Sequence, residues 1–160
     1  MEKEIKGYYN SKAGLIEIIC TDRYLISVRF VKPTIKYRNP KSLVLKETIK
    51  QLKEYFAGKL KNFRLLILLN GTEFQKKVWK EILKIEYGHI NSYKNIAIAI
   101  GSPKSSRAVG NATGQNKLAI IIPCHRVIHK DNSLSGYAYG TRIKKHLINL
   151  ENKTLNKILK

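Results

Sequence analysis

Cysteine is scarce in this chain, since Cys20 and Cys124 are the only two among 160 residues. Two cysteines cannot form the several disulfides that hold small secreted domains together. No Cys-x-x-Cys pair is present, so the spacing typical of a structural zinc site is missing. We therefore expect neither a disulfide framework nor a metal site, and two free thiols are favoured over a Cys20–Cys124 bridge.

Long apolar runs are missing as well. None approaches the roughly 20 residues that a membrane-spanning helix needs. Residues 1–6 are mostly charged and lack the apolar segment of a secretory signal. The hydrophobic fraction of 43% is nevertheless that of a chain that folds around a core. We expect a soluble, cytoplasmic protein with no membrane partner.

Acidic residues are few. The chain has 31 Lys and Arg against 11 Asp and Glu, which gives a formal net charge of +20. Between Glu86 and Glu151, nine basic residues stand against one acid, Asp131. The nine are Lys94, Lys104, Arg107, Lys117, Arg126, Lys130, Arg142, Lys144 and Lys145. A local field of positive charge favours binding to a phosphate backbone. The alternative is that these lysines are ordinary solvent-exposed surface residues.

Residues 1–70 predict a small α/β domain. Three β-prone runs at 5–9, 15–20 and 24–31 are separated by turn-like segments, which is the pattern of an antiparallel meander. Ser42 can cap a following helix that runs to about residue 57, where apolar residues recur at helical spacing. An apolar segment after it is expected to form a strand or an extended connection. Because Asn70-Gly71 then breaks the pattern, we expect two domains, 1–70 and 71–160.

Residues 71–160 predict a mainly helical domain. Its first segment, Thr72-Glu73-Phe74-Gln75, has the pattern of a capping box, and Gly88 breaks the helix that it opens. A last helix over residues 141–150 is expected to bury an apolar face, with Glu151 at its end. The basic tail, residues 152–160, is expected to fray.

A helix-turn-helix is predicted between these two helices. Ser92 can cap a helix over residues 93–100, and Ser102 can cap a second helix over residues 104–113 after a glycine turn. The second helix carries small side chains at Ser105, Ala108, Gly110 and Ala112. Glycine inside a helix costs about 1 kcal/mol relative to alanine, so close approach to another surface is one explanation. Tight packing on a neighbouring helix, with Arg107 in a surface ion pair, is the other.

The second half is organised around Ile120-Ile121-Ile122-Pro123-Cys124-His125-Arg126-Val127-Ile128. An apolar, strand-like run carries a thiol and an imidazole to the edge of the core. A thiolate is a strong nucleophile, a histidine can take the thiol proton, and a carboxylate can orient the histidine. Glu151 is the best candidate for that carboxylate. Consecutive residues of an extended backbone point to opposite sides, so contact between Cys124 and His125 needs a turn or a bridging water.

These residues alone leave three functions open. A thiol-dependent hydrolase, a DNA-binding regulator with a structural cysteine, and an enzyme that acts on nucleic acid through Cys124 all fit the pattern. The basic helix-turn-helix beside the Cys-His pair favours the enzyme that acts on nucleic acid.

Further segments complete a pattern typical of one family. They are Gly71-Thr72-Glu73-Phe74-Gln75, Val78-Trp79, Tyr87-Gly88, Ser92-Tyr93, Arg107-Ala108-Val109-Gly110, Asn116, Gly136-Tyr137-Ala138 and Glu151. Together with Pro123-Cys124-His125-Arg126, which is the most specific segment, they resemble the O6-alkylguanine-DNA alkyltransferases, or methylated-DNA–protein-cysteine methyltransferases. The first half matches weakly, mainly through Tyr55-Phe56-Ala57-Gly58. The RNase H-like α/β N-terminal domain of this family suits the strands and helix expected there.

The resemblance implies a DNA-repair reaction that needs no cofactor. Cys124 would attack the alkyl carbon on guanine O6 and keep the group as a thioether, so that each molecule acts once. His125 would act as the base through a water, with Glu151 orienting it. Asn116 would hold the turn backbone, and Tyr93 would donate a proton to the departing guanine.

The resemblance also implies a partner, duplex DNA that contains O6-alkylguanine, mainly O6-methylguanine. A monomer would bind in the minor groove and flip the damaged nucleotide out of the stack, with Arg107 filling the gap. The implied DNA-binding residues are Tyr93, Ser102, Arg107, Ala108, Gly110, Ala112 and Lys130. The implied alkyl pocket is lined by Leu134, Tyr137, Ala138 and Tyr139. The alternative is a non-catalytic helix-turn-helix protein that binds DNA or the lesion.

Two positions and one expected absence depart from the family pattern. Lys117 follows Asn116 where the family usually has proline, so the turn is expected to be looser. Tyr139 stands where many members have glycine, and a phenol there is expected to disfavour bulky adducts such as benzyl relative to methyl. Some members bind zinc in the N-terminal domain, but Cys20 is the only cysteine in that domain here, so we expect no such site.

Overall fold

The protein is described here by a computed structural model that covers residues 2–33 and 36–158. The chain divides into two compact units. The first comprises Met1–Leu69 with Lys117–Ile121, and the second comprises Asn70–Asn116 and Ile122–Lys160. Residues 117–121, expected in the second domain, thus belong to the first unit. Within the described ranges, no helix combines the length and the apolarity that crossing a bilayer requires.

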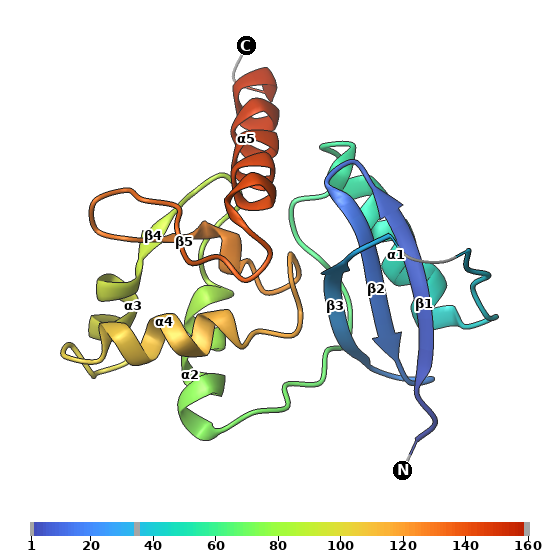
Figure 1. The fold of residues 1–160 in the computed structure, drawn as a ribbon, viewed down its shortest axis with the longest axis horizontal. Helices are drawn as coiled ribbons and strands as arrows, with labels where there is room; N and C mark the ends of the chain where they lie inside the picture. Colours follow the sequence, from blue (N-terminus) through green and yellow to red (C-terminus); the bar gives the residue numbers. More distant parts are fainter. Residues whose placement is uncertain (1, 34–35, 159–160) are drawn as a thin grey trace. The chain divides into compact units, whose positions relative to one another are not determined.

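The first unit is built on a three-stranded antiparallel sheet in the order β1-β2-β3 (Figure 1). The strands β1 (Ile5–Ser11), β2 (Gly14–Cys20) and β3 (Leu25–Val31) confirm the predicted meander. The central strand β2 is apolar except for Glu17, which pairs across the sheet with Arg29 and Lys6. β2 is the central strand, and five of its seven residues are buried.

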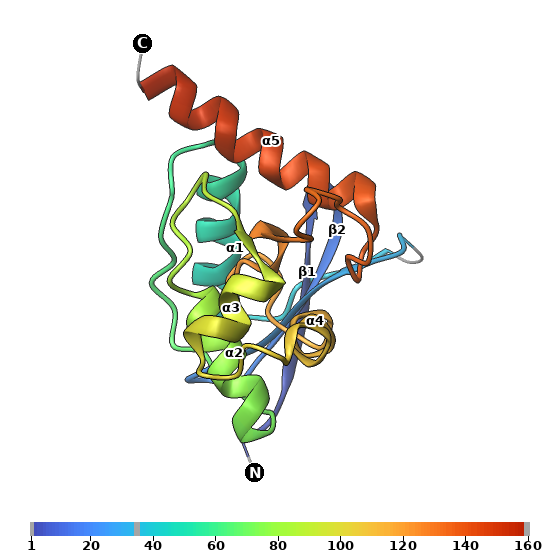
Figure 2. The same cartoon turned by 90° about the vertical axis from the view of Figure 1, so that its left-hand side faces the viewer.

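The helix α1 (Leu43–Phe56) lies along one face of this sheet and contacts all three strands (Figures 1 and 2). Ser42 caps it as predicted, because its side chain accepts a hydrogen bond from the backbone N–H of Leu45. Its buried face holds Leu52 and Phe56, which close the apolar core against the strands. The predicted α/β character of the first unit is therefore confirmed.

Two segments from elsewhere in the chain join the edge of β3. Leu25 forms a parallel bridge with Ile67, and Val28 forms one with Leu118. The backbone N–H of Val28 donates to Lys117 at 2.8 Å, and that of Ala119 donates to Val28 at 2.9 Å. The apolar run before the Cys-His pair therefore begins as part of the sheet of the first unit.

The second unit is mainly helical, as predicted. Its first helix, α2 (Glu73–Ile82), starts with the expected capping box, in which Thr72 and Gln75 exchange side-chain and backbone hydrogen bonds. Trp79 is buried in the core, and its indole Nε1 donates to the carbonyl of Ala112 at 2.8 Å. This bond fixes α2 against a later helix of the unit.

The helices α3 (Tyr93–Ala99) and α4 (Ser106–Gly114) form the predicted helix-turn-helix. Ser92 caps α3 as expected, by accepting from the N–H of Asn95. The prediction that Ser102 caps α4 is wrong. The carbonyl of Ser102 accepts from the N–H and the hydroxyl of Ser105, at 3.0 Å and 2.6 Å, so residues 102–105 form a separate turn and α4 begins after it.

The last helix, α5 (Thr141–Ile158), is longer than predicted (Figure 2). Its expected end near Glu151 is wrong, because apolar contacts continue beyond that point. Leu155 packs so closely on Gly88 that a Cβ atom added to this glycine would overlap the leucine side chain. A contact between residues so far apart in sequence is not visible in the local pattern of the tail.

Candidate active site

The segment that carries the Cys-His pair is a turn rather than the expected continuous strand. Ile120 has a φ of 71°, which breaks the extended run. After Pro123, residues Cys124–Arg126 form a single 3₁₀ turn, η1, in which the N–H of Arg126 donates to Pro123 at 2.9 Å. The short strand β5 (Val127–Ile128) follows and pairs in parallel with β4 (Asn91–Ser92). An apolar run alone does not distinguish a strand from a buried turn.

The imidazole of His125 is completely buried and bonded to a carboxylate from α5. Its Nε2 atom lies 2.7 Å from Oε1 of Glu151. Because an ionised carboxylate only accepts hydrogen bonds, the neutral ring must carry its proton on Nε2. The Nδ1 atom then keeps a lone pair, and it has no hydrogen-bond partner among the described residues. Burial lowers the pKa of His125 despite the opposing effect of Glu151, so the ring is held in the form that can accept a proton.

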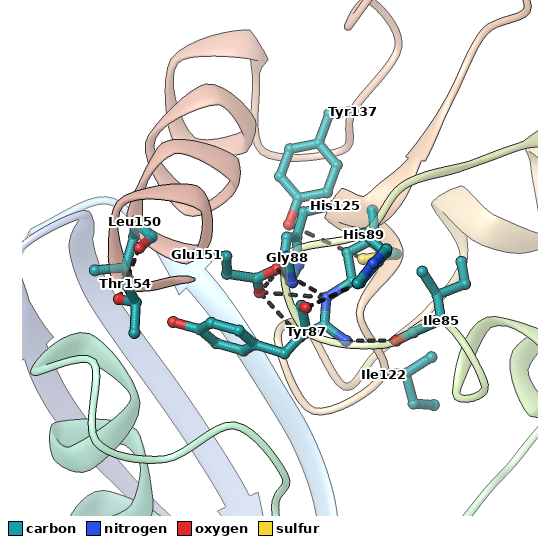
Figure 3. A network of polar contacts seen from close by, with 12 residues as sticks. Ile85, Tyr87, Gly88, His89, Ile122, His125, Tyr137, Leu150, Glu151 and Thr154 are labelled. Atoms are coloured by element: carbon teal, nitrogen blue, oxygen red, sulfur yellow. Dashed lines mark hydrogen bonds and ion pairs between the residues drawn. The ribbon is translucent and has the colours of Figure 1, made fainter. Parts of the chain in front are cut away.

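Glu151 is the centre of a buried polar network (Figure 3). Besides His125, its carboxylate accepts hydrogen bonds from the guanidinium of Arg126 and, at 3.0 Å, from the backbone N–H of Gly88. Arg126 also donates from Nη1 to the carbonyl of Ile85 at 2.7 Å. Burial alone would raise the pKa of Glu151, but His125 and Arg126 outweigh it and lower this pKa to about 2. The carboxylate is therefore charged and held in one place.

The thiol of Cys124 lies in the same unit and is only 4% exposed. Its Sγ donates to the hydroxyl of Tyr137 at 3.9 Å. Burial raises the pKa of the thiol, and hydrogen bonds to Asn116 and Tyr137 together with the charge of Lys144 offset only part of the increase. The resting group is thus a protonated thiol, and a base is needed to turn it into a nucleophile.

Lys144 on α5 is a member of this site that the sequence pattern did not single out. It is fully buried, and its Nζ donates to the carbonyl of Val127 at 2.6 Å and lies 5.7 Å from the centre of the Tyr137 ring. Burial lowers the pKa of Lys144 to about 8, against the raising effect of Cys124. The sequence does hold one indication of this burial. Lys144 is spaced from Leu147 and Glu151 so that the three residues share one face of the helix, which is the buried face.

Asn116 is buried at the point where the chain leaves α4. Its Nδ2 donates to the carbonyl of Ile122 at 3.0 Å. This carbonyl also accepts from the N–H of Cys124 at 2.7 Å. The side chain of Asn116 is therefore bonded to the backbone that precedes η1, and its hydrogen bond to Cys124 lowers the pKa of the thiol against the larger effect of burial.

Tyr93 opens α3 and faces the same region. Burial raises the pKa of its phenol, and the charge of a Cys124 thiolate adds to that increase. The ring centre lies 5.0 Å from that of His129, whose Nε2 is bonded to the carbonyl of Ser135. Nothing in the sequence pattern distinguishes His129, because its contact with Tyr93 is made across the fold.

A cavity of about 520 Å³ lies on the surface of the helix-turn-helix. Its lining residues are Tyr93, Lys94, Ser106, Arg107, Gly110, Asn111, His129, Lys130 and Gly136. Three of these carry positive charge, and no acidic residue in the described part of the chain is among them. Arg107 is exposed and forms no ion pair with a described residue, so the surface ion pair considered above is absent.

The small residues of α4 do not all share this surface. Ala108 is exposed and Gly110 is half-buried, but Ala112 is only 2% exposed. The side chain of Ala112 is buried and its backbone carbonyl accepts from Trp79, so Ala112 does not belong to the exposed surface of α4 on which it was expected. A Cβ atom added to Gly110 would lie 3.9 Å from the Tyr93 ring, which is an ordinary contact. Packing within the chain therefore does not require glycine at this position.

The space beside the Cys124 thiol is small, with a volume of about 10 Å³. Tyr93, Asn116, Thr113 and Gly114 line one part, and Gly136, Tyr137, Ala138 and Tyr139 line the other. Leu134, predicted as a pocket residue, does not line this small space, and its place in an opened pocket stays a prediction. The rings of Tyr137 and Tyr139 meet edge to face, with centres 5.6 Å apart. A volume of this size suits about one water molecule and no larger ligand.

The arrangement can therefore generate a thiolate inside the protein. A buried acid, a neutral imidazole and a thiol occupy the same unit, beside a positively charged surface. These are the parts of an activated cysteine nucleophile.

Comparison with protein-family models gives a match for each half of the chain. Residues 5–69 match the family described as 6-O-methylguanine DNA methyltransferase, ribonuclease-like domain. Residues 73–153 match 6-O-methylguanine DNA methyltransferase, DNA binding domain.

Curated relatives carry the corresponding name. The methylated-DNA–protein-cysteine methyltransferase of Methanosarcina acetivorans is 44% identical over 148 residues, which cover 89% of this chain and 95% of that protein. The protein of the same name from Methanosarcina barkeri is 51% identical over 110 residues, or 69% of this chain and 70% of that protein.

Solved structures agree with the sequence comparisons. The crystal structure of Mycobacterium tuberculosis O6-methylguanine methyltransferase superposes with a TM-score of 0.86 at 36% identity, over 95% of this chain and 94% of that chain. The M. tuberculosis protein OGT in complex with DNA gives a TM-score of 0.84 at 38% identity, over 92% of each chain. The chain therefore belongs to the family of methylated-DNA–protein-cysteine methyltransferases, the O6-methylguanine-DNA methyltransferases.

Proposed function

We propose that this protein repairs O6-alkylguanine, mainly O6-methylguanine, in double-stranded DNA by moving the alkyl group onto Cys124. The observation that carries the proposal is the buried His125–Glu151 pair, whose histidine directly follows Cys124 in the turn η1. The other cysteine, Cys20, is buried in the sheet of the first unit, where its Sγ contacts Ser42 and where burial and the charge of Asp22 both raise the pKa of the thiol. Only Cys124 therefore has the surroundings that can remove a thiol proton.

The reaction is a displacement at the alkyl carbon. The bond between Sγ of Cys124 and that carbon forms as the bond from the carbon to guanine O6 breaks. The electron pair of the broken bond passes to guanine, which takes up a proton. No cofactor is required, and the carbon–sulfur bond of a thioether is stable in water, so the thiol is not regenerated and each molecule reacts once.

The thiol proton leaves through His125. The lone pair on Nδ1 accepts it, through one water molecule, while Nε2 stays bonded to Glu151. The depressed pKa of Glu151 keeps the carboxylate charged, so it stabilises the imidazolium that forms. Glu151 thus orients and stabilises the base without taking the proton itself.

Lys144 stabilises the thiolate. Burial disfavours the negative charge on Cys124 in the resting protein, and the Lys144 ammonium is a buried cation close enough to offset part of that cost. A fixed charge in a site without bulk water is worth more than one at the surface. Asn116 contributes differently from Lys144, because it donates a hydrogen bond to the backbone that sets the position of the cysteine.

Tyr93 supplies the proton that the departing guanine needs. Burial raises the pKa of its phenol, which therefore stays protonated at neutral pH and can act as a donor. The same pKa rises further as the thiolate forms. The two proton transfers thus run on opposite sides of the reacting carbon.

A monomer binds the duplex through its minor groove. Lys130 and Arg107 face the phosphates and the flipped nucleotide from the surface cavity beside Tyr93. Ala108 and Gly110 keep the exposed side of α4 small, which suits a groove only about 6 Å wide. Ser102 lies in the turn between the two helices, at the edge of this surface.

The alkyl pocket has to open before a purine can enter, since it now holds about 10 Å³. Gly136 and Gly140, with φ of 81° and 89°, flank the segment that lines it. Movement of this segment would carry Tyr137, Ala138 and Tyr139 away from the thiol. Tyr139 adds bulk at the pocket, so methyl is preferred over benzyl.

The second unit thus serves DNA binding and transfer, and the first unit, which includes residues 117–121, is a separate α/β body. The test is a titration of a methylated duplex in excess over the full chain. Repaired guanine is expected to equal the protein added and then stop. The Cys124→Ala variant should bind the same duplex and repair none, while Cys20→Ala should repair as the unchanged protein does. Binding without repair by the unchanged protein would support the non-catalytic alternative instead.

A further inference from the structure

The first unit carries a surface groove that plays no part in the chemistry described above. It has a volume of about 900 Å³ and runs along α1 and the loop that precedes it. Its lining residues are Asp22, Asn39, Pro40, Lys41, Ser42, Leu43, Leu45, Lys46, Ile49, Lys50, Lys53 and Glu54. The volume is in the range of sites that bind a ligand or a few side chains of a partner.

Three apolar side chains of α1, Leu43, Leu45 and Ile49, line the groove. Leu43 is 85% exposed at the first position of α1, and Ile49 is half-buried one and a half turns further on. Leu45 also lines the groove and is only 1% exposed, so part of the lining belongs to the core of the unit. An exposed leucine on its own is common, but one at the mouth of an apolar groove is typical of an interaction site.

Four lysines surround these apolar residues. Lys46, Lys50 and Lys53 recur at the spacing of one helix face, and Lys41 precedes the helix. All four are exposed, and none forms an ion pair within residues 2–33 and 36–158. The two acids at the groove, Asp22 and Glu54, leave an excess of positive charge.

From these features we infer that the groove on α1 binds an acidic, amphipathic segment of a partner protein. Its apolar side chains would cover Leu43 and Ile49, and its carboxylates would face Lys46 and Lys50. When such a segment binds as a helix, its apolar side chains at i, i+4 and i+7 lie on one face and contact the groove. Charge complementarity would raise the rate of association and exclude basic partners.

The same features disfavour other occupants. The phosphates of duplex DNA would satisfy the lysines, but stacked bases would leave Leu43 uncovered. A second copy of this chain, with a net charge of +20, would bring like charge to the groove. The inference does not depend on the function proposed for Cys124, because no residue of the groove belongs to that site.

The test uses the full chain and a fluorescein-labelled peptide as the probe. The peptide has leucines at i, i+4 and i+7 and glutamates elsewhere, and a scrambled peptide of the same composition spreads the leucines around the helix. Fluorescence anisotropy measures binding to the unchanged chain and to L43S, K46E/K50E and K12E/K32E. The last variant changes the net charge equally but at lysines outside the groove.

We expect the peptide with leucines at i, i+4 and i+7 to bind more tightly than the scrambled peptide. The L43S substitution should weaken the binding of this peptide about tenfold, because one buried leucine contact is lost. K46E/K50E should also weaken it about tenfold, and K12E/K32E by no more than about twofold. Methyl transfer should be unchanged in every variant, which shows that each is folded.

Three outcomes would overturn the inference. One is equal binding of the two peptides, and another is equal loss in the two charge-reversal variants. The last is displacement of the peptide by undamaged duplex DNA from the unchanged chain but not from K46E/K50E, which would make the groove a nucleic-acid surface. Amide NMR spectra of the unchanged chain add a test without mutation, since the peptide should shift Asp22, Asn39 and residues 41–54 and leave the second unit unaffected.

Discussion

Nε2 of His125 lies 2.7 Å from Oε1 of Glu151, and neither side chain is more than 2% exposed. Arg126 adds its own hydrogen bonds to the same carboxylate. One acid therefore orients the base and compensates a buried guanidinium. The two roles mean that changing this acid affects both stability and transfer.

Glu151→Gln tests the stabilising role. The substitution leaves Arg126 buried without its counter-charge, so the free energy of unfolding should fall by about 3 kcal/mol at pH 7. Chemical denaturation measures the change. The matched control is Glu81→Gln, which removes an ion pair with Lys84 on the surface of the second unit and should cost less than about 1 kcal/mol. Similar losses in both variants would contradict the role given to Glu151.

The pH dependence of stability follows from the same pKa. The ordinary value of 4.5 is lowered to about 2 in the folded protein, so the unfolded chain binds more protons in this range. The contribution of Glu151 is therefore complete above pH 4.5 and is lost as the pH falls towards 2. The unchanged protein should lose stability more steeply than Glu151→Gln across this window, and equal slopes would contradict the assignment.

Lys144→Met should separate stability from reactivity. At pH 7 the buried ammonium is an unfavourable charge, so its removal should raise the free energy of unfolding by on the order of 2 kcal/mol, even though the carbonyl of Val127 loses a donor. Methyl transfer should slow about tenfold because the thiolate of Cys124 loses a nearby cation. Denaturation and single-turnover kinetics measure the two effects. Faster transfer by the variant would rule out the stabilising role of Lys144.

Gly88→Ala should be much more costly than Gly101→Ala. Both glycines have a φ of 77°, so each substitution carries a backbone cost of about 1 kcal/mol. A Cβ at Gly88 would also overlap Leu155 and displace α5, whereas nothing lies within 4 Å at Gly101. We expect a loss of about 3 kcal/mol or more for Gly88→Ala in chemical denaturation. Equal losses would show that α5 does not pack there as described.

Tyr139→Gly tests the size of the alkyl pocket. Removing the phenol also removes its edge-to-face contact with Tyr137, so the segment should open more easily. Reaction with O6-benzylguanine should become at least about fivefold faster, while reaction with O6-methylguanine should change little. Competition between the two substrates measures the ratio. No gain with the benzyl substrate would show that Tyr139 does not limit the pocket.

The features predicted best from the sequence are the local ones. Ser42, Ser92 and the pair Thr72 and Gln75 cap their helices as expected, because a cap is decided within four residues. The three strands of the meander were likewise predicted, since alternation and turn residues determine them.

The features that the sequence could not predict are tertiary. The extension of α5 depends on the contact of Leu155 with Gly88, which lies in another part of the chain. The burial of Lys144 depends on the carbonyl of Val127, and lysine is ordinarily a surface residue. Ala112 was assigned to the surface with Gly110, but the helical period turns the two residues to different sides.

The central claim is that Cys124 accepts the alkyl group. The most direct test is mass spectrometry of the full chain after reaction with a duplex that contains one O6-methylguanine. Intact mass should show a single methyl group per molecule, and peptide mapping should find it on the fragment with Cys124. Cys124→Ala should gain nothing, and Cys20→Ala should gain the same methyl group. No gain in mass, or a methyl group mapped to Cys20, would contradict the account.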